Sequence, residues 1–137
     1  MPFTVETSTP PDTMTPVGPY SHIAKAGPLI TIGATAGVDP KTGELAGPDV
    51  ATQTRQILDA FDVMLTSVGS NLDQILHITV YLADMADFQE MNGAYADRMG
   101  ARRPARSAVS VTGLPKPGAR LTMNLMAVAG DGGGFDA

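Results

Sequence analysis

The segment from Gln74 to Leu82 constrains the fold more than any other, because apolar residues occur on both of its faces. Its content of isoleucine, valine and tyrosine predicts a β-strand. In a regular strand, one face would carry Leu76, Ile78, Val80 and Leu82, and the other Ile75, His77, Thr79 and Tyr81. A strand with two largely apolar faces is expected in the middle of a sheet that is covered on both sides.

Two segments have the periodicity of amphipathic helices. Residues 49–69 place apolar side chains close to helical spacing, at Val50, Ile57, Phe61, Met64, Leu65 and Val68. Asp49 can cap the start of this helix, and Gly69 is a natural stop at its end. Residues 87–100 predict a second helix with a buried stripe formed by Phe88, Met91, Tyr95 and Met99.

Strands are predicted at 3–7, 21–26, 29–35, 106–112 and 120–129, in addition to the segment at 74–82. Turns are indicated at Ala26-Gly27-Pro28 and at 39–43, where proline and glycine supply the required backbone angles. The order strand, strand, strand, helix, strand, helix, strand, strand predicts an α+β fold with two helices on one face of a mixed sheet. The other face then lacks cover, so self-association is expected. We expect one domain over residues 1–130, followed by a flexible glycine-rich tail at 131–137.

Composition excludes several classes of function. The 137 residues include no cysteine, which rules out disulfides, thiolate catalysis and cysteine zinc sites. His22 and His77 have no metal-ligand spacing, so no metal or other cofactor is expected. There is no 18-residue apolar run and no secretory signal pattern, so we expect a cytoplasmic protein without a membrane partner. The net charge of −5 argues against a nucleic-acid partner, because the one basic cluster is short and consists of Arg102, Arg103 and Arg106.

Four motifs carry a resemblance to a known family. They are Gly18-Pro19-Tyr20, the turn from Asp39 to Glu44, the helical segment from Phe88 to Tyr95, and Arg103-Pro-Ala-Arg106-Ser-Ala-Val-Ser-Val with Leu114-Pro115-Lys116 after it. In the same order, over roughly residues 18–129, they resemble the motifs of the Rid family, also called YjgF, RidA or endoribonuclease L-PSP.

The resemblance implies a chorismate mutase-like fold and a homotrimer whose sheets form a central barrel, with three ligand clefts between subunits. The best-known members of the family hydrolyse 2-aminoacrylate and related enamine or imine acids to 2-keto acids and ammonia without a cofactor. Other members carry labels such as translation inhibitor or endoribonuclease. The implied partner is therefore a small carboxylate substrate. The resemblance determines the fold better than it determines the identity of that substrate.

The resemblance also assigns candidate site residues. Arg106 would hold the substrate carboxylate through parallel hydrogen bonds from its planar guanidinium. Tyr20, Gly33 and Asn92 would line the cleft. Two further cleft positions depart from the family: Ile32 stands where a serine is common, and Ala108 where a cysteine is usual.

The largest departure lies in the last strand. Deaminating members have a glutamate there that is thought to position or activate water, and Thr122 takes its place. A hydroxyl can hydrogen-bond water but cannot take up its proton at neutral pH. A positioned general base is typically worth about 10²–10⁴-fold in rate, so a slower deaminase, a shifted substrate or a binder is expected.

Several functions remain open at this point. We favour an imine or enamine deaminase with Arg106 and Thr122 at its centre. A non-catalytic metabolite-binding or regulatory homologue, or a pathway-specific hydrolase or tautomerase, is the alternative that the missing glutamate favours. A ribonuclease is disfavoured by the acidic pI of about 4.7. His22, two residues after Tyr20, is a weaker ligand candidate, whereas His77 is interpreted as structural.

Overall fold

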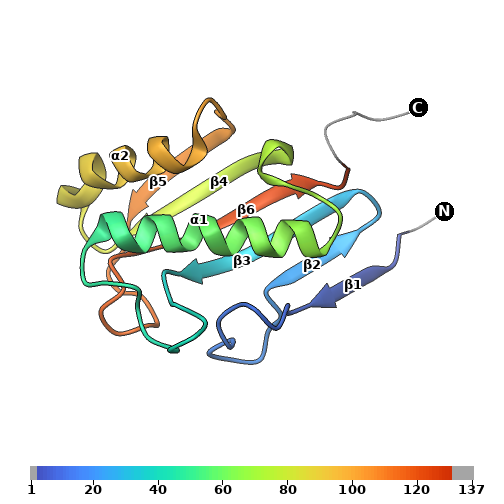
Figure 1. The fold of residues 1–137 in the computed structure, drawn as a ribbon, viewed down its shortest axis with the longest axis horizontal. Helices are drawn as coiled ribbons and strands as arrows, with labels where there is room; N and C mark the ends of the chain where they lie inside the picture. The colour runs from blue at the N-terminus through green and yellow to red at the C-terminus, as the bar shows by residue number, and fades with distance from the viewer. Residues whose placement is uncertain (1–2, 131–137) are drawn as a thin grey trace.

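The computed structural model describes residues 3–130, which form one six-stranded sheet and two α-helices (Figure 1). The elements in chain order are β1 (Val5–Ser8), β2 (Ile23–Ala26), β3 (Leu29–Ala36), α1 (Val50–Ser67), β4 (Ile75–Leu82), α2 (Phe88–Met99), β5 (Ala105–Ser110) and β6 (Leu121–Val128). Short 3-10 turns η1 (Leu72–Gln74) and η2 (Met85–Asp87) precede β4 and α2 respectively. The predicted order of elements and the α+β class are confirmed. The predicted tail, 131–137, lies outside the described residues.

The strand order in the sheet is β1-β2-β3-β6-β4-β5. The neighbouring strands β4 and β5 run parallel, whereas all other neighbours are antiparallel. β2 and β3 form a hairpin around Gly27, whose φ of 57° suits the positive-φ region that glycine enters without steric cost. The last strand, β6, therefore lies between β3 and β4, so that residues far apart in the chain become neighbours.

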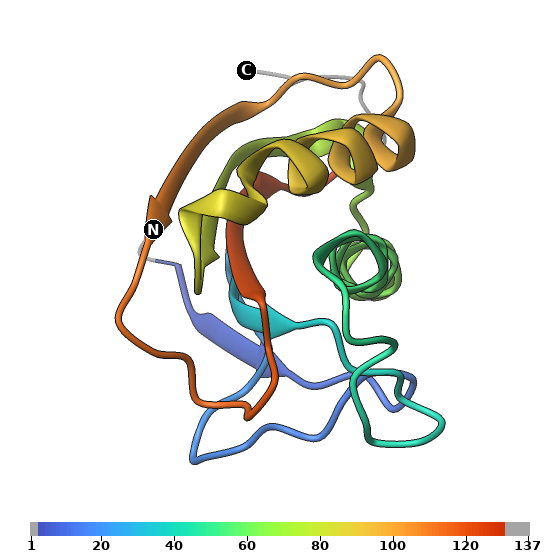
Figure 2. The same cartoon turned by 90° about the vertical axis from the view of Figure 1, so that its left-hand side faces the viewer.

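Both helices lie on one side of the sheet (Figure 2). The apolar stripe of α1 contributes Ile57, Phe61 and Leu65 to the core, all fully buried. Full burial of an apolar side chain of this size contributes about 1.5–3 kcal/mol, so the helix is stabilised mainly by tertiary packing. From α2, the predicted stripe residues Met91, Tyr95 and Met99 are buried as well, and Phe88 packs at the edge of the same core.

The ends of α1 follow the sequence signals. Asp49 is the N-cap, and its carboxylate accepts hydrogen bonds from the backbone N–H and the hydroxyl of Thr52, each at 2.9 Å. These hydrogen bonds stabilise the charged carboxylate and so lower the pKa of Asp49, with the bond from the Thr52 backbone having the larger effect. Gly69, with φ of 77°, ends the helix and turns the chain toward β4.

The predicted faces of β4 require one correction. A β-bulge between Ile75 and His77 shifts the alternation, so Ile75 is buried under the helices while Leu76 is 50% exposed. Within this chain the helices cover the face formed by Ile78, Val80 and Leu82. The face of His77, Thr79 and Tyr81 stays half-buried, so the expected cover on both sides is not supplied by the chain itself.

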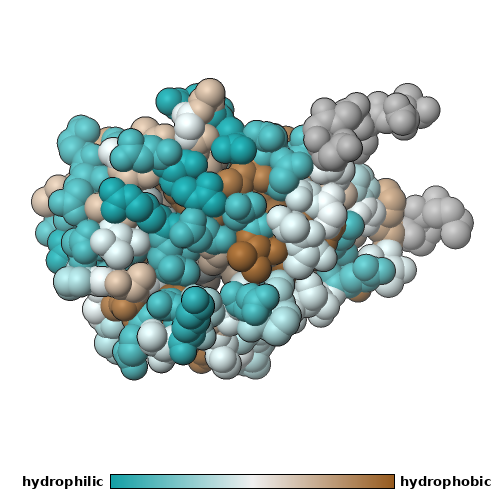
Figure 3. Space-filling view, viewed as in Figure 1, coloured by the Kyte–Doolittle hydropathy of each residue, from teal (hydrophilic) through white to brown (hydrophobic). Residues whose placement is uncertain are grey.

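The outer surface of the helical layer is mainly hydrophilic (Figure 3). That view looks onto α1 and α2, whose outward faces carry the ion pairs between Arg98 and the carboxylates of Asp59 and Asp62. Among residues 3–130, no helix combines the length and the apolar character that crossing a membrane requires.

Candidate functional site

A cavity of about 370 Å³ opens beside the bulged part of β3. Three of the predicted site residues line it: Tyr20, Gly33 and Thr122. The rest of the lining consists of Met14, Val17, Ser21, Ala34, Ala36, Pro115 and Lys116. The cavity is therefore mostly apolar, with a few polar groups, which is the usual character of a small-molecule site.

Gly33 leaves one wall of this cavity open. The register of β3 against β6 shifts between Ile32 and Thr35, and Gly33 lies in this bulge. A Cβ atom built on Gly33 would meet nothing within 4 Å, so the backbone itself is accessible from the cavity. Its N–H donates to the carbonyl of His22 at 3.0 Å, and its carbonyl accepts from the Thr35 hydroxyl at 2.9 Å.

The loop before β2 forms the opposite wall. The Tyr20 hydroxyl accepts a hydrogen bond from the backbone N–H of Val17 at 3.2 Å, which closes the loop around the ring. Behind it lies His22, which is 1% exposed and meets the edge of the Tyr20 ring, with the ring centroids 6.2 Å apart. The His22 Nε2 contacts the carbonyl of Met14. His22 thus supports the wall from behind and does not line the cavity.

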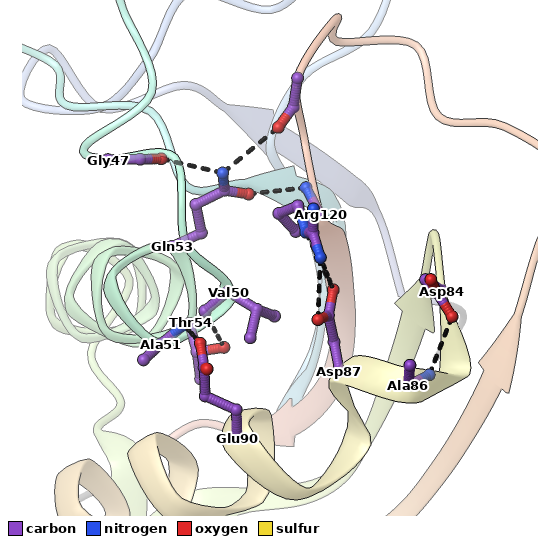
Figure 4. A network of polar contacts seen from close by, with 11 residues as sticks. Gly47, Val50, Ala51, Gln53, Thr54, Asp84, Ala86, Asp87, Glu90 and Arg120 are labelled. Carbon is purple, nitrogen blue, oxygen red and sulfur yellow. Dashed lines mark hydrogen bonds and ion pairs between the residues drawn. The ribbon is translucent and has the colours of Figure 1, made fainter.

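The third wall is the loop that carries Pro115 and Lys116, and Gln53 of α1 fastens the end of this loop (Figure 4). The fully buried Gln53 amide donates to the carbonyls of Gly47 at 2.9 Å and Gly118 at 3.3 Å. Its Oε1 accepts from the backbone N–H of Arg120 at 2.7 Å. One helical side chain therefore ties two loops to the start of β6, two residues before Thr122.

The Arg120 side chain adds a second connection in the same region (Figure 4). Its guanidinium pairs with both carboxylate oxygens of Asp87, at 2.8 and 2.9 Å. Asp87 is at the start of α2, so this bidentate pair joins the beginning of β6 to the second helix.

Arg106 and Asn92 lie together, but away from this cavity. The Arg106 Nη2 donates to Asn92 Oδ1 at 2.8 Å. The guanidinium carbon lies 4.8 Å from the centroid of the Tyr95 ring and 5.8 Å from that of Phe88. These three partners belong to α2, so the Arg106 side chain is on the helix-covered side of edge strand β5.

Thr122 lies on the opposite side of the sheet from Arg106. Its neighbours in β6, Leu121 and Met123, are both in the core under the helices, so Thr122 faces the other way. β4 also separates the strands that carry Thr122 and Arg106. One copy of this chain therefore presents the predicted site as two separate halves.

The side chains of Ile32 and Ala108 do not line the cavity. Ile32 is 1% exposed and belongs to the core, so only its backbone lies near the cavity. Ala108 packs against the core from β5. On the uncovered sheet face, His77 Nε2 lies 3.1 Å from the Ser107 hydroxyl.

The charges near the site are positive. Among the described residues that line the cavity, Lys116 is the one charged side chain, and none is a carboxylate. Burial raises the pKa of Tyr95 above its ordinary value, although the nearby positive charge of Arg106 acts in the opposite direction. Within residues 3–130, no three histidine, aspartate or glutamate side chains gather as metal ligands would.

Sequence reasoning missed several residues of this region. Lys116 belongs to the Leu114-Pro115-Lys116 motif, which is the sequence signal for its place in the cavity lining. Nothing in the sequence indicates that Gln53 is buried, since a glutamine in an amphipathic helix is expected to face solvent. A larger hollow of about 800 Å³, which Lys116 also lines, lies between Glu44, Asp84 and Arg120 and includes none of the predicted site residues.

Proteins of known family resemble this chain over most of its length. The profile of the family described as "Endoribonuclease L-PSP" matches residues 11–129. A "RutC family protein" of Pyrococcus horikoshii is 46% identical over 74% of this chain and 80% of its own length. The human "2-iminobutanoate/2-iminopropanoate deaminase" is 33% identical over 83% of this chain and 82% of its own length.

Solved structures agree with the sequence relatives. The crystal structure of the E. coli YjgF gene product superposes with a TM-score of 0.82 at 32% identity, covering 90% of this chain and 98% of that one. A Rid family protein from Yersinia pestis gives a TM-score of 0.86 at 28% identity, covering 92% and 100%. Since the family profile spans most of the chain and the motifs, fold and relatives agree, this chain belongs to the Rid family, the family also described as endoribonuclease L-PSP.

Proposed function

We propose that this protein hydrolyses small 2-imino or enamine carboxylic acids to 2-keto acids and ammonia, at a site shared by two copies of the chain in a homotrimer. Relatives support the reaction class, since the human protein and one from Arabidopsis thaliana bear the names of imine and reactive-intermediate deaminases. The substrate range and the roles of individual residues are part of the proposal, and the contacts described below support them.

The observation that carries the proposal is the state of Arg106. Its guanidinium contacts Asn92, Met91 and two aromatic rings, all of them neutral. Among the described residues it has no carboxylate within ion-pair distance, unlike Arg98, Arg102 and Arg120. A half-buried cation without a counter-charge attracts an anion, and a planar guanidinium suits a carboxylate.

The two halves of the site require a second copy. Arg106 and the cavity of Gly33 and Thr122 are on opposite sides of the sheet, so one chain cannot bring them to a single ligand. The sheet face without helices carries half-buried residues that need a covering layer, among them Thr79 and Tyr81. Packing copies around these faces would bring the edge strand β5 of one subunit to the cavity of its neighbour.

The proposed reaction needs one water. With the substrate carboxylate held by Arg106, the imine carbon would face the cavity of the adjacent subunit, where the Thr122 hydroxyl can hydrogen-bond water. The water oxygen bonds to the imine carbon while the C=N π electrons move to nitrogen. One water proton passes to nitrogen and gives a carbinolamine. Transfer of the remaining hydroxyl proton to nitrogen is followed by cleavage of the C–N bond, which releases ammonia and leaves the 2-keto acid. An enamine first shifts a proton from nitrogen to its terminal carbon, which gives the imine.

Freshly generated 2-iminopropionate and 2-iminobutyrate provide the direct test, with 2-keto acid release followed above the uncatalysed background. We expect turnover by the wild type and none above background by Arg106→Ala. Pyruvate binding should be lost in the same variant. Unchanged pyruvate affinity in Arg106→Ala would refute the anchoring role. Light scattering should show a trimer, and a monomer at micromolar concentration would contradict the shared site.

A second candidate function is metabolite binding without turnover. The specific observation in its favour is that no carboxylate lines the cavity among the described residues. Thr122 stands where the family resemblance implies a glutamate. Under this alternative, pyruvate binds through Arg106 but the imines hydrolyse at the background rate. Thr122→Glu would then be expected to restore turnover, because the rest of the cleft is retained.

A ribonuclease function, which the family description suggests, fits the charges poorly. The net charge is −5, and Arg102 of the short basic cluster is paired with Asp73 at 2.6 Å. An RNA partner would need several unpaired cations in a row to neutralise phosphates.

A further inference from the structure

A single face of α2 holds the Arg106 guanidinium. Phe88, Met91, Asn92 and Tyr95 are spaced by three and four residues, so they share one side of the helix. The Tyr95 ring lies under the guanidinium at 4.8 Å, and Phe88 flanks it at 5.8 Å. Aromatic rings at such distances attract the cation and restrict its movement.

Asn92 contacts one edge of the guanidinium. Its Oδ1 accepts from Nη2 at 2.8 Å, while Nη1 is directed to the Met91 sulfur at 3.8 Å. The side-chain oxygen of Asn92 therefore faces the arginine and accepts its hydrogen bond. The family resemblance implies that Asn92 lines the cleft, and this contact gives its side chain a partner within the chain as well.

The charge of the acceptor is the decisive property. An aspartate at position 92 would reach the same nitrogen but would form an ion pair with Arg106, and the bound carboxylate would have to compete with it. An asparagine fixes the guanidinium with a neutral acceptor and leaves the positive charge uncompensated. The other neighbours, Met91, Tyr95 and Phe88, are neutral too.

We infer that Asn92 is a positioning residue, whose requirement is a neutral hydrogen-bond acceptor that orients Arg106 without neutralising it. The Tyr95 ring serves as the platform for the same guanidinium. The inference rests on the proposed anchoring of a substrate carboxylate by Arg106. It attributes the preference for anionic ligands to the hydrogen bond between the charged Arg106 and the neutral Asn92.

The test is the affinity for pyruvate, measured by calorimetry on the full chain at one ionic strength. Asn92→Asp should melt at or above the wild-type temperature, because an ion pair replaces a neutral bond, yet bind pyruvate at least about tenfold more weakly. Asn92→Ala, which removes the acceptor without adding charge, should lose less affinity than Asn92→Asp. A residue with a purely structural role would show the reverse order, with the alanine variant the more impaired.

Gln89→Glu is the matched control, since it adds the same charge to the exposed side of α2 and should leave pyruvate affinity unchanged. Wild-type affinity in Asn92→Asp, combined with loss of binding in Arg106→Ala, would overturn the inference and leave the proposed function standing. Retained binding in Arg106→Ala would overturn both.

Discussion

Gln53 allows the sharpest test of how this fold positions the candidate site. Its amide makes three hydrogen bonds to the backbone of separate segments, at Gly47, Gly118 and Arg120. Gln53→Met keeps the length of the side chain and its helix propensity while removing all three bonds. Each such bond contributes about 1 kcal/mol net, so the free energy of unfolding should fall by about 3 kcal/mol, and by more if the Arg120 N–H stays buried without an acceptor.

The expected loss is large enough to measure in a thermal melt. For a chain of this size, a loss of about 3 kcal/mol corresponds to a decrease of about 10 °C in melting temperature. The melts should be followed by circular dichroism at a fixed protein concentration, because self-association makes the melting temperature depend on concentration. Pyruvate affinity should fall as well, since the loop with Lys116 loses its attachment.

Gln56→Met provides the matched control on the same helix. Gln56 is half-buried, and its side chain forms no hydrogen bond with any residue that the structure describes. The control should melt within about 2 °C of the wild type, as expected for a substitution away from special features. If Gln53→Met had the same melting temperature as Gln56→Met, the buried amide would not fasten these loops and the reasoning would be wrong.

Two further predictions concern the cavity and the first helix. Gly33→Val should fill the open space beside the bulge and weaken pyruvate binding several-fold. The melting temperature should not fall, because a Cβ there meets nothing within 4 Å. Thr31→Val, on the same strand outside the cavity, is its control, and unaltered binding in Gly33→Val would place the ligand elsewhere. Asp49→Ala should lower the melting temperature at neutral pH by removing the α1 cap. The pKa of Asp49 is lowered in the folded protein, so the stabilising effect of the carboxylate is complete above pH 3.8, its ordinary pKa, and is lost as the pH falls below that value. A difference in melting temperature between wild type and Asp49→Ala that persisted at such acidic pH would contradict the charged cap.

Local signals in the sequence determined the elements of this fold. The helical periodicity of residues 49–69 predicted α1 to within two residues at its C-terminal end, because the apolar stripe, the Asp49 cap and Gly69 all act over a few residues. The stripe of α2 and the hairpin at Gly27 were predicted for the same reason. The order of the motifs further identified the family, and the family profile confirms that assignment.

Long-range pairing decided what the sequence could not. The alternation along β4 did not reveal the bulge after Ile75, since a bulge depends on how the partner strand β6 pairs. Tertiary structure alone shows that Gln53 is buried and bonded. It also places Arg106 against α2 and Thr122 on the other side of the sheet, although the sequence assigned both to one site. Strand order and side-chain direction depend on contacts between distant segments, and local periodicity carries no information about them.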